Sequence, residues 1–513
     1  METLKLGSKP LTLEEVREVA IQGRKVALSS GALKKIERSH KFLKEKIGTG
    51  ETYYGINTGF GVLSNVKIPD AQIETLQYNL LRSHACGVGG YLSDIFVRAM
   101  LLLRAAALTY GNSGVSAGLV RQILELLNRG VCPLVPEQGS VGASGDLAPL
   151  SHLALVLIGE GRARVLGKEM SGAQALKAAK LKPIRLGPKE GLALINGTQF
   201  MTAIGAVVLL EAEHLSDVAD VAGAMTLEAL RGTELAFEKE IHDLRPHPGQ
   251  IEVAANLRKL LISGGKKSGI STSHEDCGKV QDPYSLRCMP QVHGATRDAL
   301  TFVRDVLTRE INSVTDNPLV FAETGRILSG GNFHGQIVSM ALDFLAIADA
   351  ELASISEQRL AKLINPQLSD LPIFLTRQGG LNSGFMMVQV AAASIVSENK
   401  TLCHPAVVDS LPTNVDKEDH VSMGAWAARK AAMVTINTRR VLAMELLAAA
   451  QGIDLLRPLK TSSVLEKVHR LVRKRVKMLD EDRPFHPDFA KIEDLIESYE
   501  LEATVRECLL LPR

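Results

Sequence analysis

Ala143, Ser144 and Gly145 stand together in a small, glycine-rich stretch, residues 139–150, whose single charged residue is Asp146. In this order of residues, the amide nitrogen of Gly145 could fold back onto the carbonyl carbon of Ala143. Loss of two waters, one from that carbonyl and one from the Ser144 side chain, would leave a methylidene group on a five-membered imidazolone ring. Glycine minimises crowding at the attacking nitrogen, and serine is the residue that dehydrates to an alkene. The product is an electrophile, which ordinary side chains lack and which a cofactor normally supplies.

The same stretch also fits a purely structural role. Glycines permit sharp turns, so the stretch taken alone favours a buried turn that feeds a helix, with Asp146 or Ser151 as its cap. Residues elsewhere in the chain must decide between the two interpretations.

Polar side chains gather at four further places, each at the edge of an apolar segment. Burying charge is costly unless the charge is paired, so such clusters favour a site, although helix capping explains each of them alone. They are residues 196–199 (Asn-Gly-Thr-Gln), 281–288 (Gln-Asp-Pro-Tyr-Ser-Leu-Arg-Cys), 330–335 (Gly-Gly-Asn-Phe-His-Gly) and 417–420 (Lys-Glu-Asp-His).

A glycine-rich loop with aromatic residues, 53–61, precedes these clusters. Such loops can hold phosphate, but this one has neither the GxGxxG spacing nor a following Lys-Ser/Thr, so it is weak evidence for nucleotide binding. Tyr54 in this loop is either functional or packed on its own glycines. His84, at the end of an apolar helical pattern, is by itself typical of a hydrogen-bonded core histidine.

Two common enzyme classes lack their signatures. There is no HExxH motif and no Cys/His ligand spacing, so we expect no metal. A serine hydrolase needs GxSxG, but Asp146 stands where the second glycine would be. The cysteines form no CxxC pair and predict reduced thiols in a cytoplasmic protein; they are Cys86, Cys132, Cys277, Cys288, Cys403 and Cys508.

Composition narrows the remaining classes. The 513 residues carry a formal net charge of +2, which gives no indication of nucleic acid or an anionic membrane as partner. A hydrophobic content of 45% with only 4% aromatic residues favours close-packed helices. The N-terminus lacks the apolar stretch of a signal peptide. Residues 191–210 are uncharged and about long enough to span a bilayer, but their polar side chains and the flanking Glu190 and Glu211 favour a buried core helix.

The chain pattern predicts a mainly α protein. A capping box at Thr12 begins a first helix, and Val165, Leu166, Ile184 and Leu186 suggest short strands in a less regular region. Long helices follow, several apolar on nearly every face, as in the interior of a bundle. We place them at 199–230, 294–312, 335–363, 383–399 and 423–455, with an amphipathic helix at 464–479. We expect a smaller, mixed N-terminal region, 1–190, that carries the Ala-Ser-Gly loop, and a helical part, 191–513, forming one compact unit.

Taken together, the motifs resemble those of the aromatic amino acid ammonia-lyases, in family order and over most of the chain. Residues 143–147 resemble the family signature, in which Ala-Ser-Gly forms the methylidene-imidazolone (MIO) electrophile. Further resemblances are residues 54–61, 196–198, 281–287, Asn317-Pro318, 331–335 and 418–423. The resemblance implies a fumarase/aspartase-like helical architecture, no external cofactor, and a homotetramer whose active sites draw on more than one chain.

The resemblance also implies a role for each site residue. Tyr284 would remove the β-proton, with Tyr54 near the amine. A tyrosine base needs a lowered pKa, which a neighbouring cation would supply. Arg287 would bind the substrate carboxylate. Asn196 and Gln281 would support the cofactor and the carboxylate, Phe333 would wall the cofactor, and Asp146 would assist cyclisation of the tripeptide.

Two positions indicate the substrate ring. Within the family, residues 83–84 and 418 face that ring; phenylalanine-specific members are apolar at the first and carry Gln at the second, and tyrosine-specific members usually have His-Leu at the first. Here Ser83-His84 and Glu418 suit a ring with N–H donors. The implied reaction converts L-histidine to trans-urocanate and ammonia, the first step of histidine degradation. Lys417 stands where the family usually has Gln, and its ammonium would favour the ionised form of Glu418.

Three alternatives remain open. Tyrosine ammonia-lyase or aromatic aminomutase activity would keep the cofactor; an aminomutase returns the amine to the β-carbon. A fumarase/aspartase-type lyase would have a similar helical build without MIO. A non-enzymatic helical scaffold would leave the polar clusters without a purpose.

Overall fold

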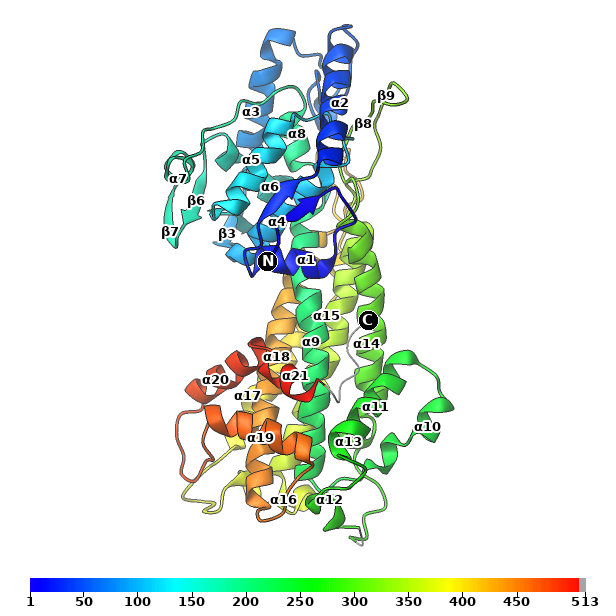
Figure 1. Ribbon diagram of the computed structural model, residues 1–513, viewed down its shortest axis with the longest axis vertical. Helices are drawn as coiled ribbons and strands as arrows, with labels where there is room; N and C mark the ends of the chain where they lie inside the picture. The colour runs from blue at the N-terminus through cyan, green and yellow to red at the C-terminus, as the bar shows by residue number, and fades with distance from the viewer. Residues whose placement is uncertain (276, 507–513) are drawn as a thin grey trace. The chain divides into compact units, whose positions relative to one another are not determined.

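Helices dominate the computed structural model, which describes residues 1–275 and 277–506 (Figure 1). The mainly α prediction is confirmed. The chain divides into two compact units, each drawn from three stretches of sequence. Unit 1 comprises residues 1–210, 304–343 and 405–429, and unit 2 comprises 211–303, 344–404 and 430–513. The expected boundary between an N-terminal region, 1–190, and a helical part, 191–513, stays a prediction.

Unit 1 mixes helices with small sheets. Its helices are α1 (Leu13–Ala20), α2 (Ser30–Ile47), α3 (Ile73–His84), α4 (Asp94–Leu108), α5 (Ala117–Asn128), α6 (Leu147–Leu157), α7 (Gly172–Ala178) and α8 (Glu190–Ile195), with 3-10 turns at Gly61–Leu63, Asp70–Gln72 and Ala406–Val408. Its strands are β1 (Leu4–Leu6), β2 (Val26–Leu28), β3 (Val88–Tyr91), β4 (Val131–Pro133), β5 (Pro136–Gln138), β6 (Arg162–Val165), β7 (Lys168–Ser171), β8 (Leu319–Phe321) and β9 (Arg326–Leu328).

The strands pair in small, separate sheets. β1 and β2 are parallel, with Leu4 opposite Val26, and β3 pairs with β5 antiparallel. β4, β6 and β7 form an antiparallel sheet, and β8 pairs with β9. The strand suggested around Val165 is β6. Leu166 instead lies in the turn after it with φ of 48°, and residues 184 and 186 are not in strands.

Four long helices contribute residues to both units: α9 (Gln199–Ala229), α14 (Met289–Glu310), α15 (Gln336–Ile364) and α18 (Gly424–Leu455). The remaining helices of unit 2 are α10 (Lys239–Asp243), α11 (Pro248–Leu261), α12 (Gly269–Thr272), α13 (Tyr284–Arg287), α16 (Pro366–Ser369), α17 (Met386–Leu402), α19 (Ser463–Arg475), α20 (His486–Glu497) and α21 (Glu500–Val505), with 3-10 turns at Glu234–Phe237 and Ile373–Leu375. The predicted long helices are all present, with ends that differ by up to five residues.

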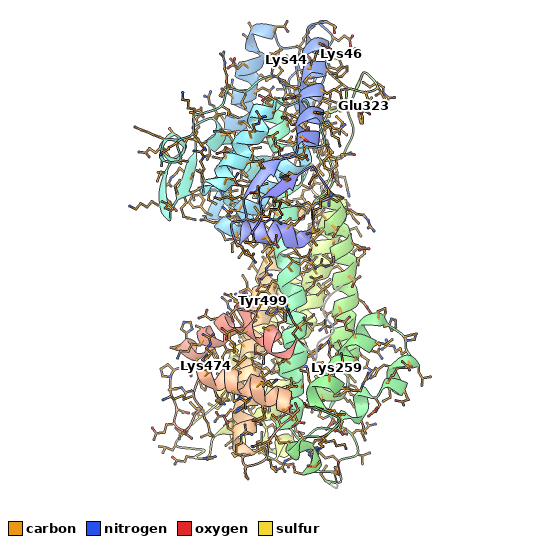
Figure 2. The ribbon with its side chains drawn as sticks, in the orientation of Figure 1. Lys44, Lys46, Lys259, Glu323, Lys474 and Tyr499 are labelled. Carbon is orange, nitrogen blue, oxygen red and sulfur yellow. The ribbon has the colours of Figure 1, made fainter. Side chains whose placement is uncertain are left out.

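Local sequence explains several helix ends. The Thr12 side chain accepts from the Glu15 amide, and Glu15 closes the predicted capping box. Lys44 and Lys46 occupy the last turn of α2 (Figure 2), where basic side chains complement the helix dipole.

In unit 2, the Tyr499 ring stacks on His214 with ring centroids 4.0 Å apart.

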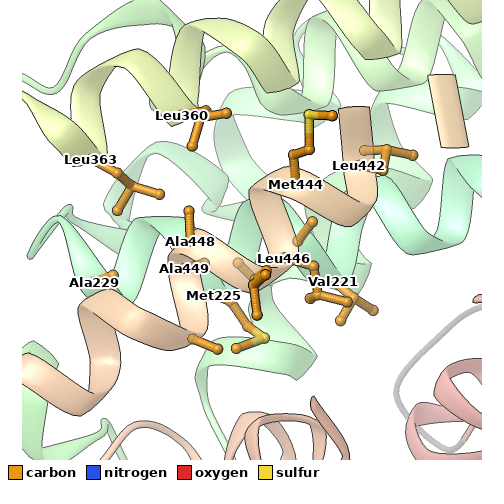
Figure 3. Close-up of a cluster of buried hydrophobic side chains, with 14 of the residues drawn as sticks. Val221, Met225, Ala229, Leu360, Leu363, Leu442, Met444, Leu446, Ala448 and Ala449 are labelled. Carbon is orange, nitrogen blue, oxygen red and sulfur yellow. The ribbon is translucent and has the colours of Figure 1, made fainter. Parts of the chain in front are cut away.

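The core of unit 2 is built from small and branched aliphatic side chains. Helices α9, α15 and α18 meet there, and Val221, Leu360 and Leu446 are fully or almost fully removed from solvent (Figure 3). Alanines such as Ala448 and Ala449 let these helices approach closely. The low aromatic content therefore serves tight helix packing, as the composition indicated.

The uncharged stretch 191–210 is not one continuous helix. It contains α8, a break at residues 196–198, and the first turns of α9, and most of its side chains are buried. None of the helices within the described residues combines the length and apolar character needed to cross a bilayer. The described cysteines are free thiols; Cys508 lies outside the described residues.

Candidate active site

The Ala-Ser-Gly tripeptide forms a tight turn between β5 and α6, in unit 1. Gly145 has φ of +73°, and a Cβ at this position would lie 2.3 Å from the carbonyl oxygen of Gly197. The two glycines pair backbone to backbone, and the Asp146 amide donates to the Gly197 carbonyl oxygen at 2.7 Å. Only glycine fits position 145, because a side chain would meet both a strained backbone and a blocked space.

Asp146 is fully buried directly behind the tripeptide. Its carboxylate accepts from the Ser140 hydroxyl and from the Met201 amide, both at 3.0 Å. Met201 lies in the first turn of α9, so Asp146 caps that helix and makes no side-chain cap on its own helix, α6. Ser151 is no cap either, since its hydroxyl donates to the Leu147 carbonyl within α6. Burial raises the pKa of Asp146 to about 7, although both hydrogen bonds act in the opposite direction.

Ser144 is held at both of its oxygen atoms. Its hydroxyl donates to Glu418 Oε1 at 2.9 Å, and its carbonyl oxygen accepts from Asn196 Nδ2 at 2.9 Å. The other oxygen of Glu418, Oε2, accepts from the Thr413 hydroxyl at 2.8 Å. Residues far apart in the sequence therefore fix the serine from opposite ends.

The segment after Glu418 also binds the loop that carries the tripeptide. The Met423 amide donates to the Val141 carbonyl oxygen at 2.9 Å, and the Ser422 hydroxyl donates to the Gly142 carbonyl oxygen at 3.2 Å. The motif at 418–423 thus positions the loop at 139–145 as well as supplying a side chain to the site.

A buried polar network lies beneath Asn196. Arg104, which α4 presents to the interior, donates through Nη1 to the Asn196 carbonyl oxygen at 2.7 Å and to Gln199 Oε1 at 3.0 Å. Burial lowers the pKa of Arg104 to about 10. Lys189 and Asp316 form a fully buried ion pair at 2.6 Å, and burial lowers the pKa of this lysine. The hydrogen bonds of Arg104 hold the backbone of the turn at 196–198.

Four helices begin directly after the site motifs. α6 begins at Leu147, α9 at Gln199, α15 at Gln336 and α18 at Gly424. A helix N-terminus carries a partial positive charge. The motifs therefore stand where developing negative charge is stabilised, which also explains why polar clusters occur at the edges of apolar helices.

A cavity of about 970 Å³ opens above the tripeptide, and unit 1 supplies its whole lining. Predicted site residues in the lining are Tyr54, His84, Ala143, Ser144, Asn196, Phe333 and Glu418. Gly145 and Asp146 directly follow Ser144 in the sequence and are not among the lining residues. This volume matches that of small-molecule sites.

His84 has a defined hydrogen-bonding direction. Its Nδ1 lies 2.9 Å from the Leu80 carbonyl oxygen, so Nδ1 carries the proton and Nε2 is left as an acceptor. Burial lowers the pKa of His84, against the opposing effects of the Leu80 carbonyl and Glu418. The neutral ring can therefore accept a hydrogen bond from a ligand N–H. The hydroxyl of Tyr54, on the loop at 53–61, accepts from the Gly61 amide at 3.3 Å.

The remaining predicted residues belong to unit 2 and are not in this cavity lining. They are Gln281, Tyr284 and Arg287. Tyr284 is 72% exposed, with the Arg287 guanidinium 4.6 Å from its ring centroid. Arg287 Nε donates to the Asp282 carbonyl oxygen at 3.0 Å. The tripeptide and these three residues therefore belong to different compact units of the chain.

Sequence reasoning missed three residues that hold the site: Thr413, Gly197 and Arg104. Gly197 was within a recognised motif but had no role assigned. Thr413 precedes Glu418 by five residues in a loop without helical or strand periodicity, and Arg104 is one of two arginines in a largely apolar helix. A charged residue in such a helix is the one signal that points to a buried network. Within the described residues, no cluster of three or more His, Cys, Asp or Glu side chains is arranged to hold a metal ion.

Comparison with known proteins identifies the family of this chain. The model of the aromatic amino acid lyase family matches residues 11–474. The chain belongs to the aromatic amino acid lyase family. A histidine ammonia-lyase of Anaeromyxobacter dehalogenans (strain 2CP-C) is 53% identical over 511 residues, which cover 98% of this chain and 100% of that protein.

Other family members are similar over comparable lengths. A histidine ammonia-lyase of Bos taurus is 51% identical over 94% of this chain and 74% of its own length. The crystal structure of a histidine ammonia-lyase from Trypanosoma cruzi has a TM-score of 0.92 at 44% identity, covering 99% of this chain and 96% of that one. A tyrosine aminomutase from Streptomyces globisporus has a TM-score of 0.93 at 36% identity, covering 100% of both chains. The family is therefore that of carbon–nitrogen lyases with this helical architecture, as the motifs predicted.

Proposed function

We propose that this chain is a histidine ammonia-lyase: it eliminates ammonia from L-histidine to give trans-urocanate, using an MIO group formed from Ala143, Ser144 and Gly145. One observation carries the proposal. His84 and Glu418 belong to the same cavity lining as Ser144, which supports a site that binds a ring with N–H donors. The similarity to histidine ammonia-lyases over nearly the whole chain supports the same substrate.

The tripeptide fits the cofactor. Gly145 has the positive φ and the lack of space for a Cβ that a compressed Ala-Ser-Gly turn requires, and Ser144 has a polar partner at each oxygen. The MIO group, once formed, would supply an electrophile that draws electron density from the substrate as the amine departs. No external cofactor is part of this proposal.

The residues of the cavity have distinct roles. His84 Nε2 accepts from an N–H of the substrate imidazole, and Glu418 binds the opposite side of the ring. Asn196 Oδ1 is buried and has no partner among the described residues, so it is available to the substrate ammonium. Phe333 forms a wall of the cavity, and the Tyr54 hydroxyl assists proton transfer near the amine.

We further propose that Tyr284, Arg287 and Gln281 reach the cavity from other copies of this chain, in a homotetramer with shared active sites. The 72% exposure of Tyr284 supports this arrangement. Tyr284 would remove the β-proton, and Arg287 would bind the carboxylate in a bidentate pair. Free cysteines at the described positions suit a cytoplasmic enzyme, and the near-neutral net charge favours a small-molecule substrate over nucleic acid or membrane.

Separate incubations with L-histidine, L-tyrosine and L-phenylalanine test the function. The ultraviolet absorbance of the unsaturated acid and released ammonia should appear with L-histidine. A β-amino acid product would instead indicate an aminomutase, and activity only on L-tyrosine would reject the proposed substrate.

The Ser144→Ala variant tests the cofactor. Its mass should equal that of the unmodified sequence, whereas the wild-type mass should be lower by two waters. Turnover should be abolished. An active Ser144→Ala enzyme would contradict the cofactor assignment.

A further inference from the structure

Arg104 brings a positive charge into the interior of unit 1 that is not fully neutralised. Its side chain is fully buried, and among the described residues the acid that attracts it is Asp316. Asp316 already forms a buried ion pair with Lys189 at 2.6 Å. Burial lowers the pKa of Arg104 only to about 10, so the guanidinium stays protonated at neutral pH. Two buried cations therefore share one carboxylate, which leaves an excess of positive charge.

A second fully buried arginine, Arg359 in unit 2, shows the usual solution to this problem. Its Nε and Nη2 donate to the Glu445 carboxylate at 2.5 and 2.8 Å. The corresponding Nε and Nη2 of Arg104 have no hydrogen-bond partner among the described residues. Because burying an incompletely paired charge is costly, helix packing alone does not explain an arginine at this position.

The Arg104 guanidinium contacts the turn that supports the tripeptide. Its Nη1 donates to the Asn196 carbonyl oxygen at 2.7 Å, and a Cβ added to Gly197 would lie 2.7 Å from the same nitrogen. Asn196 Nδ2 in turn donates to the Ser144 carbonyl oxygen at 2.9 Å, and Gly197 pairs with Gly145. Asn196 and Gly197 therefore contact both the buried charge and the tripeptide.

The Ser144 carbonyl oxygen is the atom on which this charge would act. If the imidazolone ring forms, this oxygen becomes the ring carbonyl oxygen, conjugated with the methylidene group. Electron density that the ring draws from a substrate therefore collects on it. A fixed positive charge in the protein interior stabilises such density more strongly than the same charge would in water.

We propose that Arg104 is a positioning residue that acts through Asn196 and Gly197, and that its unneutralised charge stabilises negative charge on the Ser144 carbonyl oxygen. This inference rests on the proposed function. It goes beyond holding the turn, because hydrogen bonds to backbone carbonyl oxygens do not require a charged donor. Since the excess charge belongs to both cations, removal of either Arg104 or Lys189 should weaken the electrophile.

Two variants remove the charge in different ways. Arg104→Gln keeps an amide donor but no charge, whereas Lys189→Met leaves the hydrogen bonds of Arg104 in place. The ultraviolet difference spectrum of each variant, taken against the same variant carrying Ser144→Ala, reports the conjugated group directly. Its excitation moves electron density toward the carbonyl oxygen, which a nearby positive charge favours. Both variants should therefore absorb at shorter wavelength than the wild type, Lys189→Met by the smaller amount.

Turnover of L-histidine gives a second measurement. In Arg104→Gln, kcat should fall about 10-fold or more, because removing a group that stabilises developing charge costs at least this much. KM should change little, since Arg104 is not in the cavity lining. Lys189→Met should show a smaller fall in kcat.

Arg98→Gln is the matched control. Arg98 lies in the same helix, α4, and donates to the backbone carbonyl oxygens of Val19 and Ala20, which are outside the cavity lining. This variant loses hydrogen bonds of the same kind and should keep the wild-type absorbance and kcat.

Intact mass identifies the variants that carry the two-water deficit. The inference is overturned if a variant with this deficit, Arg104→Gln or Lys189→Met, keeps the wild-type absorbance and kcat, or if Arg98→Gln shows the same shift. If only one of the two charge variants matures, that variant decides. If neither matures while Arg98→Gln does, the cations serve folding of the turn, and the inference is again overturned. A wild type without the two-water deficit would instead refute the proposed function itself.

Discussion

Gly145 and Gly197 meet backbone to backbone, and this contact determines how tightly the tripeptide turns. Because a Cβ on residue 145 would lie 2.3 Å from the Gly197 carbonyl oxygen, the turn tolerates no side chain there. The chemistry assigned to Ser144 therefore depends on a neighbour that contributes no side chain at all.

Gly145→Ala should lose the two-water mass deficit and lower the free energy of unfolding by roughly 1–3 kcal/mol, the usual cost of a strained backbone position. Intact mass and denaturant unfolding measure the two effects. Gly167→Ala is the control: Gly167 has a similar φ of +76°, but nothing lies within 4 Å of the added Cβ. Its stability should fall while its mass deficit remains. Equal maturation of both variants would contradict the steric argument.

Asp146 gives the fold a pH dependence with a defined sign. Burial raises its pKa from 3.8 to about 7, so the protonated form is favoured in the folded state. This contribution to stability is fully present below the unfolded pKa and is lost as the pH rises through about 7. The asparagine of Asp146→Asn cannot ionise, so this variant does not lose stability in the same way as the pH rises.

The difference in unfolding free energy between Asp146→Asn and its parent should therefore shift in favour of the variant as the pH rises from about 4 to 7. Both proteins should carry Ser144→Ala, so that neither forms the cofactor. Denaturant unfolding at several pH values gives the measurement. Parallel stability curves would show that Asp146 does not titrate in this range.

At the scale of elements, local patterns in the sequence were enough to predict much of the helical framework. Apolar periodicity and the capping box at Thr12 located the long helices and one helix start. The suggested strands at Ile184 and Leu186 were wrong, because burial of isolated aliphatic residues does not require a sheet. The hydrogen bond from Ser144 to Glu418 also could not be predicted. The two residues are 274 positions apart, and no local pattern encodes that contact.

Helices α15 and α18 are joined in unit 2 by an ion pair that has no access to solvent. Arg359 Nε and Nη2 contact Glu445 at 2.5 and 2.8 Å, and Glu445 also accepts from Thr226 and Ser356. Charges in the interior are tolerated only with such complete pairing.

Glu445→Leu should lower the free energy of unfolding by about 3–5 kcal/mol, because it leaves the Arg359 guanidinium buried and unpaired. Arg359→Met combined with Glu445→Leu should recover much of this loss. Thermal or denaturant unfolding of the single and double variants provides the test. A double variant no more stable than Glu445→Leu alone would contradict the uncompensated-charge explanation.

At the scale of the whole molecule, the cavity and Tyr284 belong to different compact units of the chain. If active sites are shared between copies, two inactive variants can restore each other. Co-expression of Ser144→Ala with Tyr284→Phe should give mixed tetramers in which about a quarter of the sites hold both intact residues, by random assembly.

The activity of the co-expressed mixture should rise toward this fraction, while each variant alone stays inactive. Mixing the two proteins after separate assembly is the control and should restore nothing until subunits exchange. An inactive co-expressed mixture containing verified mixed tetramers would place both residues in sites from a single chain.

The hydrogen bonds from Ser422 and Met423 to the loop at 139–145 have a consequence for biosynthesis. When a ribosome has translated only the first two hundred residues, the tripeptide exists but its later partners do not. The reactive alkene would thus arise only after the far part of the polypeptide has been made and has docked. If the proposed MIO group forms, no electrophile would be exposed on the nascent chain, and the loss of two waters from the mass would report that unit 1 has finished folding.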